Sequence, residues 1–357
     1  MEKLKQRLKK VSLTPLYSLL MALVIGGIII LGSGNNPFEI YGKLITGALG
    51  TRNGILQTLL QSTPLIFCGL SVAFGMRGGV LNLGVEGQLY MGALAATLVA
   101  LGGEGLPSVV LIPLCLIAGM LGGAVWSLLP IVLKLKRGVH EVVTALMLNY
   151  IATLFIDFMT NYRLMAEGSS VAQSETFPEA AWLPKLFPRS QVTCGIFIGL
   201  ALAVILAFVL KKTVLGYQIT LVGQNELSAK AAGVPVGKVM VTTMLISGMC
   251  AGLAGTVEVM GTYNRLIMGF SPGYGFDGIA VAVLGSSPIM VVFSALLFGI
   301  LRAGGTALQF GTNLSVKFIS ALQGIIIILI AAPALCSHLY AAIRKKKKTG
   351  KEELKNG

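Results

Sequence analysis

Three polar side chains that could bind a solute cluster in one glycine-rich stretch of this sequence. Asn82, Glu86 and Gln88 lie within GVLNLGVEGQ (79–88), where an apolar run begins, and Asn149 lies in the middle of a later apolar run. A carboxylate or an amide among apolar residues is costly unless it lines water or has a hydrogen-bonding partner. We therefore predict that these four residues line a solute path, with ties between neighbouring helices as the alternative for each.

A second set of charged residues suggests an ion pair. Arg302 is a cation inside an apolar stretch, and Glu258 and Asp277 are acids near the ends of two other such stretches. An unpaired arginine within a membrane costs roughly several kcal/mol on insertion scales. We predict that Arg302 pairs with one of the two acids, preferably Glu258. The alternative is that its side chain extends to the lipid headgroups.

Signals of enzymatic chemistry are missing from the sequence. The two histidines, His140 and His338, are too far apart in sequence to suggest a metal pair, and the five cysteines are scattered. The stretch GVPVGK (233–238) lacks the glycine spacing of a phosphate-binding loop and is followed by Val239 instead of Ser or Thr. We predict that the chain is not an enzyme, has no catalytic residue, metal or cofactor, and does not itself hydrolyse ATP.

The composition identifies the elements that must position these residues. Of the 357 residues, 55% are hydrophobic and only 12% are charged, and the mean hydropathy is +0.82, which excludes a soluble globular domain. The net charge of +14 lies in short blocks between long apolar runs, so it does not indicate nucleic-acid binding. We predict an all-α, multi-pass protein of the cytoplasmic membrane.

The apolar runs also predict the number of membrane spans, because a bilayer core of about 30 Å needs about 20 apolar residues per helix. We expect ten spans, with eight or nine possible if the short eighth one is re-entrant. The runs are 11–38, 54–76, 87–103, 105–133, 142–156, 190–210, 239–257, 273–286, 288–308 and 318–343. The eighth and ninth are separated at Pro288, because proline disfavours helix in the preceding residue and suits the start of a new helix.

The positions of Lys and Arg in short loops predict the orientation, since such residues favour the cytoplasmic side. This rule places two basic tails, 1–12 and 341–357, in the cytoplasm, on either side of a membrane domain, 13–340. It places 211–238 inside and the polar loop 161–189 outside. Segment 211–238 mixes polar and small residues and contains Pro235, so we predict a short surface helix within it.

Glycines spaced by four residues predict close contacts between helices. The pairs Gly119/Gly123 and Gly248/Gly252 lie in the middle of two apolar runs. Small residues let helix backbones approach each other where lipid supplies no hydrophobic driving force.

Five ordered motifs resemble the membrane permeases of ABC importers for branched-chain amino acids and simple sugars, specifically the nucleoside-type branch. The motifs are PLIFCGLSVAFGMRGGVLNLGVEGQLYMGA (64–93), GVHEVVTALMLNYIA (138–152), LGYQITLVGQNELSAKAAGVPVGKV (215–239), ISGMCAGLAGTVEVMG (246–261) and GFDGIAVAVLGSSP (275–288). The resemblance covers 57–332. It implies a permease subunit that pairs with a second, related permease, a cytoplasmic ATP-binding subunit and an extracytoplasmic solute-binding lipoprotein.

The resemblance also implies alternating-access transport of nucleosides, with ATP hydrolysed by the separate ATPase. Segment 211–238 resembles the coupling helix that docks in a cleft of that ATPase, with the movement transmitted through Gly216, Asn225, Ala232 and Gly233. A ribose- or galactose-type sugar and a branched-chain amino acid are alternative solutes. A proton-coupled secondary transporter with Glu86 or Asp277 as proton relay is an alternative of another class, and it would not need the coupling segment.

Overall fold

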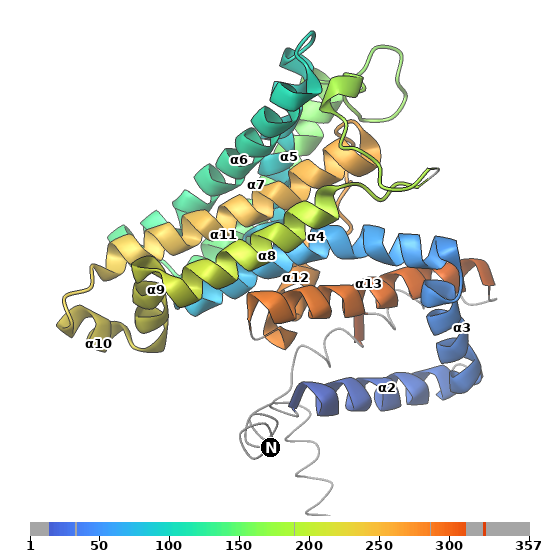
Figure 1. The fold of residues 1–357 in the computed structure, drawn as a ribbon, viewed down its shortest axis with the longest axis horizontal. Helices are drawn as coiled ribbons and strands as arrows, with labels where there is room; N and C mark the ends of the chain where they lie inside the picture. The colour runs from blue at the N-terminus through green and yellow to red at the C-terminus, as the bar shows by residue number, and fades with distance from the viewer. Residues whose placement is uncertain (1–13, 33, 189, 286, 312–323, 326–357) are drawn as a thin grey trace, which may run out of the picture. The chain divides into compact units, whose positions relative to one another are not determined.

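The computed structural model describes residues 14–32, 34–188, 190–285, 287–311 and 324–325 (Figure 1). Both basic tails, 1–12 and 341–357, lie outside the described residues. So does the expected tenth span, 318–343, apart from 324–325. The described part of the chain is almost entirely helical, with three isolated β-bridges in its loops.

The chain divides into two compact units, 1–47 with 304–357, and 48–303. The first unit contains α2 (Thr14–Gly32), most of α3 (Pro37–Leu49) and the end of α13 (Pro288–Gly311). Inside this unit the α13 backbone at Gly304 lies against Leu44 of α3. Helix α3 was not predicted as a separate helix from the sequence.

The second unit contains the helices that position the candidate site. They are α4 (Arg52–Arg77), α5 (Val85–Gly102), α6 (Ser108–Arg137), α7 (Glu141–Phe158), α8 (Gly195–Lys212), α9 (Val214–Gln224), α10 (Glu226–Ala231), α11 (Val236–Glu258), α12 (Tyr274–Leu284) and most of α13. Two π-helical turns, η1 (Met159–Arg163) and η3 (Val259–Tyr263), extend α7 and α11, and a 3₁₀ turn, η2 (Glu179–Ala181), lies in the long loop before α8.

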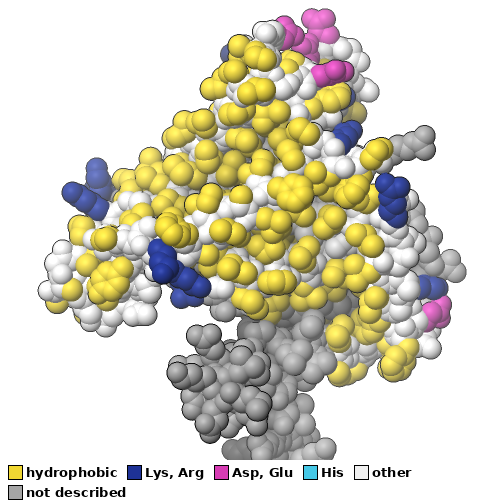
Figure 2. All heavy atoms as spheres, in the orientation of Figure 1, with side chains coloured by type: hydrophobic (Ala, Val, Ile, Leu, Met, Phe, Trp, Pro, Cys, Tyr) yellow, Lys and Arg dark blue, Asp and Glu magenta, His cyan; other side chains and the backbone are white. Residues whose placement is uncertain are grey.

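Seven helices among the described residues are long and apolar enough to cross a membrane, or eight if α2 and α3 form one bent span. The seven are α4, α5, α6, α7 with η1, α8, α11 with η3, and α13. Figure 2 shows hydrophobic side chains over most of the visible face of these helices. The protein is therefore a multi-pass membrane protein.

Helix α12 has 11 residues and is too short to cross a bilayer. Its bounds, and the start of α13 at Pro288, agree with the short eighth run and the break predicted from Pro288. At the start of α13, the Ser287 carbonyl accepts a hydrogen bond from the Val291 N–H at 2.9 Å. The proline thus occupies the first helical position, where its missing N–H carries no cost.

Helices α5, α6 and α11 pack with their backbones in contact. A Cβ atom on Gly123 of α6 would fall on the Gly248 carbonyl of α11 and 2.8 Å from the Gly252 Cα. A Cβ atom on Gly92 of α5 would fall on the Gly252 backbone. The close packing predicted from the glycine spacing of α6 and α11 is therefore confirmed.

The connecting segments differ between the two ends of the helices in the second unit. Helices α9 and α10 lie at one end (Figure 1). The long loop before α8 lies at the other end, where it is hydrogen-bonded to the segment that follows α11. The Ser174 N–H donates to the Leu266 carbonyl at 2.8 Å and the Phe177 N–H to the Asn264 carbonyl at 2.9 Å.

Candidate functional site

The chain leaves helical geometry between α4 and α5, and a buried polar network holds this break in place. Gly79 has a φ of +72°, a conformation that glycine adopts at little cost. Beyond it, the fully buried Asn82 donates to the Gln88 side-chain oxygen and to Ser247 Oγ of α11, each at 2.8 Å. Ser247 in turn donates to the Ser71 carbonyl of α4 at 2.7 Å.

The amide of Gln88 completes this network. Its nitrogen donates to Asn82 Oδ1 at 3.0 Å, and the same oxygen accepts from the Gly84 N–H at 3.0 Å. The two side chains therefore satisfy each other and the backbone. This arrangement links α4, α5 and α11 at the level of the break.

Asn149 connects α7 to the same region. Its side-chain oxygen accepts from the Gly87 N–H in the first turn of α5 at 2.8 Å, and its side-chain nitrogen donates to the Leu83 carbonyl at 2.8 Å. Amides of a helix's first turn lack a partner within the helix. Asn149 supplies a hydrogen-bonding partner for the Gly87 amide from a neighbouring helix. The sequence showed Asn149 only as an isolated amide side chain in an apolar run.

Glu86 lies at the N-terminus of the short helix α12. Its Oε2 atom accepts from the Gly275 N–H at 2.6 Å, and the side chain is buried. A carboxylate at this position is favoured by the free amides and the dipole of the helix. A Cβ atom on Gly275 would lie 2.5 Å from the Glu86 backbone nitrogen, so the close approach requires glycine.

Arg302 of α13 pairs with Asp277 of α12. Their side chains form a salt bridge at 2.7 Å, and Arg302 also donates to the Pro272 carbonyl at 3.2 Å and lies 4.7 Å from the centre of the Tyr274 ring. The expected preference for Glu258 is corrected by this geometry. Asp277 lies on the helix that directly precedes α13, whereas Glu258 ends α11, which packs mainly against α5 and α6.

A row of amides on α4 leads toward this ion pair, and sequence analysis missed it. Asn53, Gln57 and Gln61 are spaced by four residues, and the Tyr274 hydroxyl donates to the Gln61 side-chain oxygen at 3.1 Å. A hollow of about 380 Å³ adjoins the first two. Its lining residues are Asn53, Leu56, Gln57, Leu60, Ser190, Gln191 and Val192. The repeat of amides within an apolar run was the signal that could have revealed it.

Segment 211–238 folds into two short helices, α9 and α10. Asn225 begins α10, with its side-chain oxygen accepting from the Ser228 N–H at 3.0 Å. Ala232 and Gly233 end it on the exposed surface, and Gly233 has a φ of +77°. Gly216 is buried, and a Cβ atom there would fall on the Val209 carbonyl at the end of α8.

Leu227 is the feature of α10 that sequence analysis missed. Its side chain is 79% exposed on a helix whose other outward residues are polar or small. Single exposed apolar side chains are common on protein surfaces, so Leu227 gains significance only from its place in the segment that resembles a coupling helix.

Helix α9 contacts the break between α4 and α5 directly. A Cβ atom on Gly223 would fall on the Arg77 carbonyl and lie 3.0 Å from the Gly79 nitrogen. The described residues include no group of three or more His, Cys, Asp or Glu side chains that could hold a metal ion.

Comparisons with known proteins agree over most of the chain. A family model for the branched-chain amino acid transport system permease component matches residues 54–331. The guanosine ABC transporter permease protein NupP of Bacillus subtilis is 35% identical over 343 residues, which cover 94% of this chain and 97% of NupP. The nucleoside ABC transporter permease protein NupB of Lactococcus lactis is 33% identical and covers 82% of this chain and 83% of NupB. The glucose ABC transporter permease protein TsgB13 of Haloferax volcanii is 32% identical and covers 89% of this chain and 86% of TsgB13.

Proposed function

The chain belongs to the family of permease components of branched-chain amino acid transport systems, and we propose that it is the membrane-spanning permease of an ATP-driven nucleoside importer. The observation that carries the choice of solute is its similarity to a guanosine permease and a nucleoside permease over more than four fifths of the chain. Its partners are a second, related permease, a cytoplasmic ATPase and an extracytoplasmic solute-binding lipoprotein. This chain moves the solute and the ATPase hydrolyses ATP.

The distribution of charge supports an orientation with α9 and α10 in the cytoplasm. The cations at that end of the helices are Arg77, Lys134, Lys136, Arg137, Lys211, Lys212, Lys230 and Lys238. On the visible face in Figure 2, the charged side chains near α9 are Lys and Arg, whereas the opposite end carries acidic side chains together with Lys and Arg. Cytoplasmic loops carry this excess of positive charge. The long loop before α8 is then extracytoplasmic.

The exposed end of α10 is the docking surface for the ATPase in this proposal. Leu227 supplies an apolar anchor, and Ala232 and Gly233 leave room for a partner close to the backbone. Gly216 and Asn225 act indirectly, because they fix the shapes of α9 and α10.

A continuous set of contacts connects this docking surface to α12. Movement of α10 and α9 reaches the break between α4 and α5 through Gly223, because the α9 backbone there lies against Arg77 and Gly79. From the break, Glu86 reaches the first turn of α12 through the Gly275 N–H. We propose that ATP-driven closure of the ATPase shifts α12 by this route.

The solute path follows the amides of α4 in this proposal. The hollow beside Asn53 and Gln57 is its extracytoplasmic mouth, and Gln61 is the next amide along the helix. Amide side chains both donate and accept hydrogen bonds, which suits the base and ribose hydroxyls of a nucleoside. Glu86 borders the inner part of the path. The side chains of Asn82, Gln88 and Asn149 also border the path, but they connect helices, since they are hydrogen-bonded to other residues of the chain.

Uptake by whole cells tests the solute class. Cells with and without this gene are given labelled guanosine, glucose or ribose at equal concentrations. We expect loss of the gene to abolish most high-affinity guanosine uptake and to leave glucose and ribose uptake unchanged. Loss of glucose uptake with unchanged guanosine uptake would show that the sugar relative indicates the solute.

A further inference from the structure

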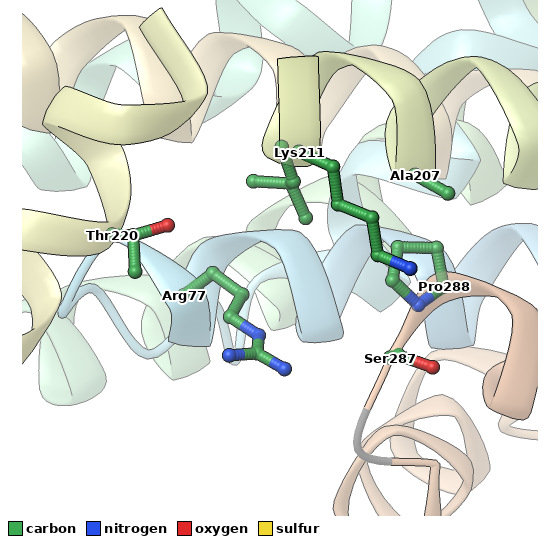
Figure 3. Close-up of a pocket in the computed structure, with 7 residues that line it drawn as sticks. Arg77, Ala207, Lys211, Thr220, Ser287 and Pro288 are labelled. Carbon is green, nitrogen blue, oxygen red and sulfur yellow. The ribbon is translucent and has the colours of Figure 1, made fainter. Parts of the chain in front are cut away.

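A small basic hollow lies where α4, α8 and α9 meet the turn between α12 and α13. Its volume is about 140 Å³, and its lining residues are Arg77, Ala207, Leu210, Lys211, Thr220, Ser287 and Pro288. Figure 3 shows the side chains of Arg77 and Lys211 extending from α4 and α8 toward the turn at Ser287 and Pro288. Among the residues that the structure describes, none that lines this hollow is acidic.

The chemistry of this hollow suits a phosphate group. Two cations line it, and the N-terminus of the 24-residue helix α13 borders it at Pro288. Ser287 Oγ accepts from the Met290 N–H at 3.4 Å, which leaves its hydroxyl hydrogen for an anion. The Thr220 hydroxyl donates to the Gly216 carbonyl at 2.8 Å, so Thr220 contributes shape and not a donor.

A second, apolar hollow continues from the basic one. It has a volume of about 300 Å³ and shares Arg77, Ser287 and Pro288 with the first. Its remaining lining residues are Ala73 and Met76 of α4 and Ala282, Val283 and Gly285 at the end of α12. A phosphate site that opens directly into an apolar hollow matches a ligand with a phosphate next to a hydrocarbon chain.

The depth of the two hollows matches the headgroup region of a bilayer. Arg77 and Lys211 lie in the last turns of α4 and α8, two helices that are apolar and long enough to span it. Beyond the hollow, α13 exposes Ile289, Met290 and Phe293, which are 47%, 48% and 62% exposed. Basic pockets between membrane helices on the cytoplasmic side are known to bind lipid headgroups.

We propose that this amphipathic hollow binds an anionic phospholipid. The phosphate is held between Arg77, Lys211 and the start of α13, and one acyl chain lies along the apolar part between α4 and α12. The lipid connects the turn after α12 to the end of α8, so it stabilises the position of the short helix. This assignment does not depend on which solute the protein transports.

Native mass spectrometry of the purified importer complex tests this site. The complex is delipidated and titrated with dioleoyl phosphatidylglycerol or dioleoyl phosphatidylethanolamine, for the wild type and for Lys211→Gln and Arg77→Gln. Each cation near a lipid phosphate contributes about a fivefold change in affinity. We therefore expect phosphatidylglycerol to bind more tightly than phosphatidylethanolamine, and each substitution to weaken it by about fivefold.

Matched controls separate this site from general charge effects and from folding. Lys212→Gln removes an adjacent cation that does not line the hollow, and Lys211→Arg keeps the charge, so both are expected to bind like the wild type. Inorganic phosphate at millimolar concentration should not displace the lipid. If Lys211→Gln and Arg77→Gln bind phosphatidylglycerol like the wild type, the assignment is wrong. If inorganic phosphate displaces it, the hollow is a site for a soluble anion instead.

Discussion

At the residue scale, the buried polar side chains of this protein are engaged with partners that lie far away in sequence. Asn82 and Gln88 were identifiable from the sequence as polar residues in an apolar setting. Their connection to Ser247 was not, because that residue lies 165 positions from Asn82 and contacts it only through the packing of α11. The apolar surroundings make an unpaired polar side chain energetically costly in the membrane. Tertiary packing then determines which partner forms a hydrogen bond with that side chain.

The ion pair of Arg302 shows the same limit. The sequence indicated that Arg302 needs an acid and named two at comparable depth. The choice between them depends on how α12 and α13 face each other across the turn at Pro288, a feature of packing that the apolar pattern does not contain. The structure places Asp277 2.7 Å from Arg302.

A double-mutant cycle measures this pair. Arg302→Met alone and Asp277→Asn alone each remove one member of an ion pair whose side chains are both 16% exposed, at a cost of about 1–3 kcal/mol. We expect the double variant to lose clearly less stability than the sum of the single losses, measured by thermal unfolding in detergent. The cycle of Arg302→Met with Glu258→Gln is the comparison, because the Arg302 charge also acts on Glu258, and we expect a smaller coupling there than with Asp277. Additive losses in the Asp277 cycle would contradict the pairing.

At the element scale, the sequence predicted helices better than it predicted their breaks and contacts. The runs that became α4 to α8, α11, α12 and α13 were recognisable because each is apolar and bounded by charged residues, glycine or proline. Helix α3 was missed because its 13 residues are only partly apolar and follow a long apolar run. The close approach of α5, α6 and α11 was readable from glycine spacing, since only small residues permit it.

The contact of α6 with α11 at Gly123 can be tested by substitution. Gly123→Ala places a methyl group on the Gly248 carbonyl and the Gly252 backbone, so α6 and α11 must separate. We expect a loss of about 1–3 kcal/mol of stability, measured by thermal unfolding of the purified protein. Gly102→Ala is the matched control, because nothing lies within 4 Å of a Cβ atom there, and it should have little effect. An equal effect of the two substitutions would show that the glycine contact is not limiting.

The proposed docking of the ATPase on α10 can be tested at Leu227. Leu227→Asp replaces an apolar side chain that is 79% exposed, so the isolated permease should keep its stability. We expect uptake, and co-purification of the ATPase, to fall at least tenfold, as for loss of an interface anchor. Leu227→Met is the control and should retain both. Gly233→Arg is less informative, because the φ of +77° strains any other residue. Normal co-purification with Leu227→Asp would exclude α10 as the anchor.

At the scale of the whole molecule, charge and apolar content determine how the chain lies in a membrane. Cations gather at the end of α9 and α10, and the long loop before α8 lies at the other end of the same helices. The number of membrane spans is harder to predict from composition than the orientation. Helix α12 is apolar yet only 11 residues long, and the sequence cannot distinguish such a half-helix from a full span without its tertiary contacts.

Labelling of single cysteines tests the orientation. In a cysteine-free background, Val171→Cys in the long loop and Ser228→Cys on α10 both occupy exposed positions. We expect an impermeant thiol reagent to label position 171 in intact cells and position 228 only after the cells are broken. Labelling of position 228 in intact cells would place the proposed ATPase docking surface on the wrong side.

Transport by the purified complex tests whether this chain carries nucleosides across the membrane with energy from ATP. The importer complex that contains this chain is reconstituted into proteoliposomes with the ATPase facing outward and the binding protein enclosed, and release of enclosed labelled guanosine to the outside is followed with and without external ATP. We expect ATP-dependent guanosine movement that enclosed unlabelled nucleosides suppress and enclosed glucose does not. The Leu227→Asp complex should lose it. ATP-dependent movement of glucose with no movement of guanosine would show that the solute is a sugar, and guanosine movement driven by a proton gradient without ATP would exclude an ATP-driven importer.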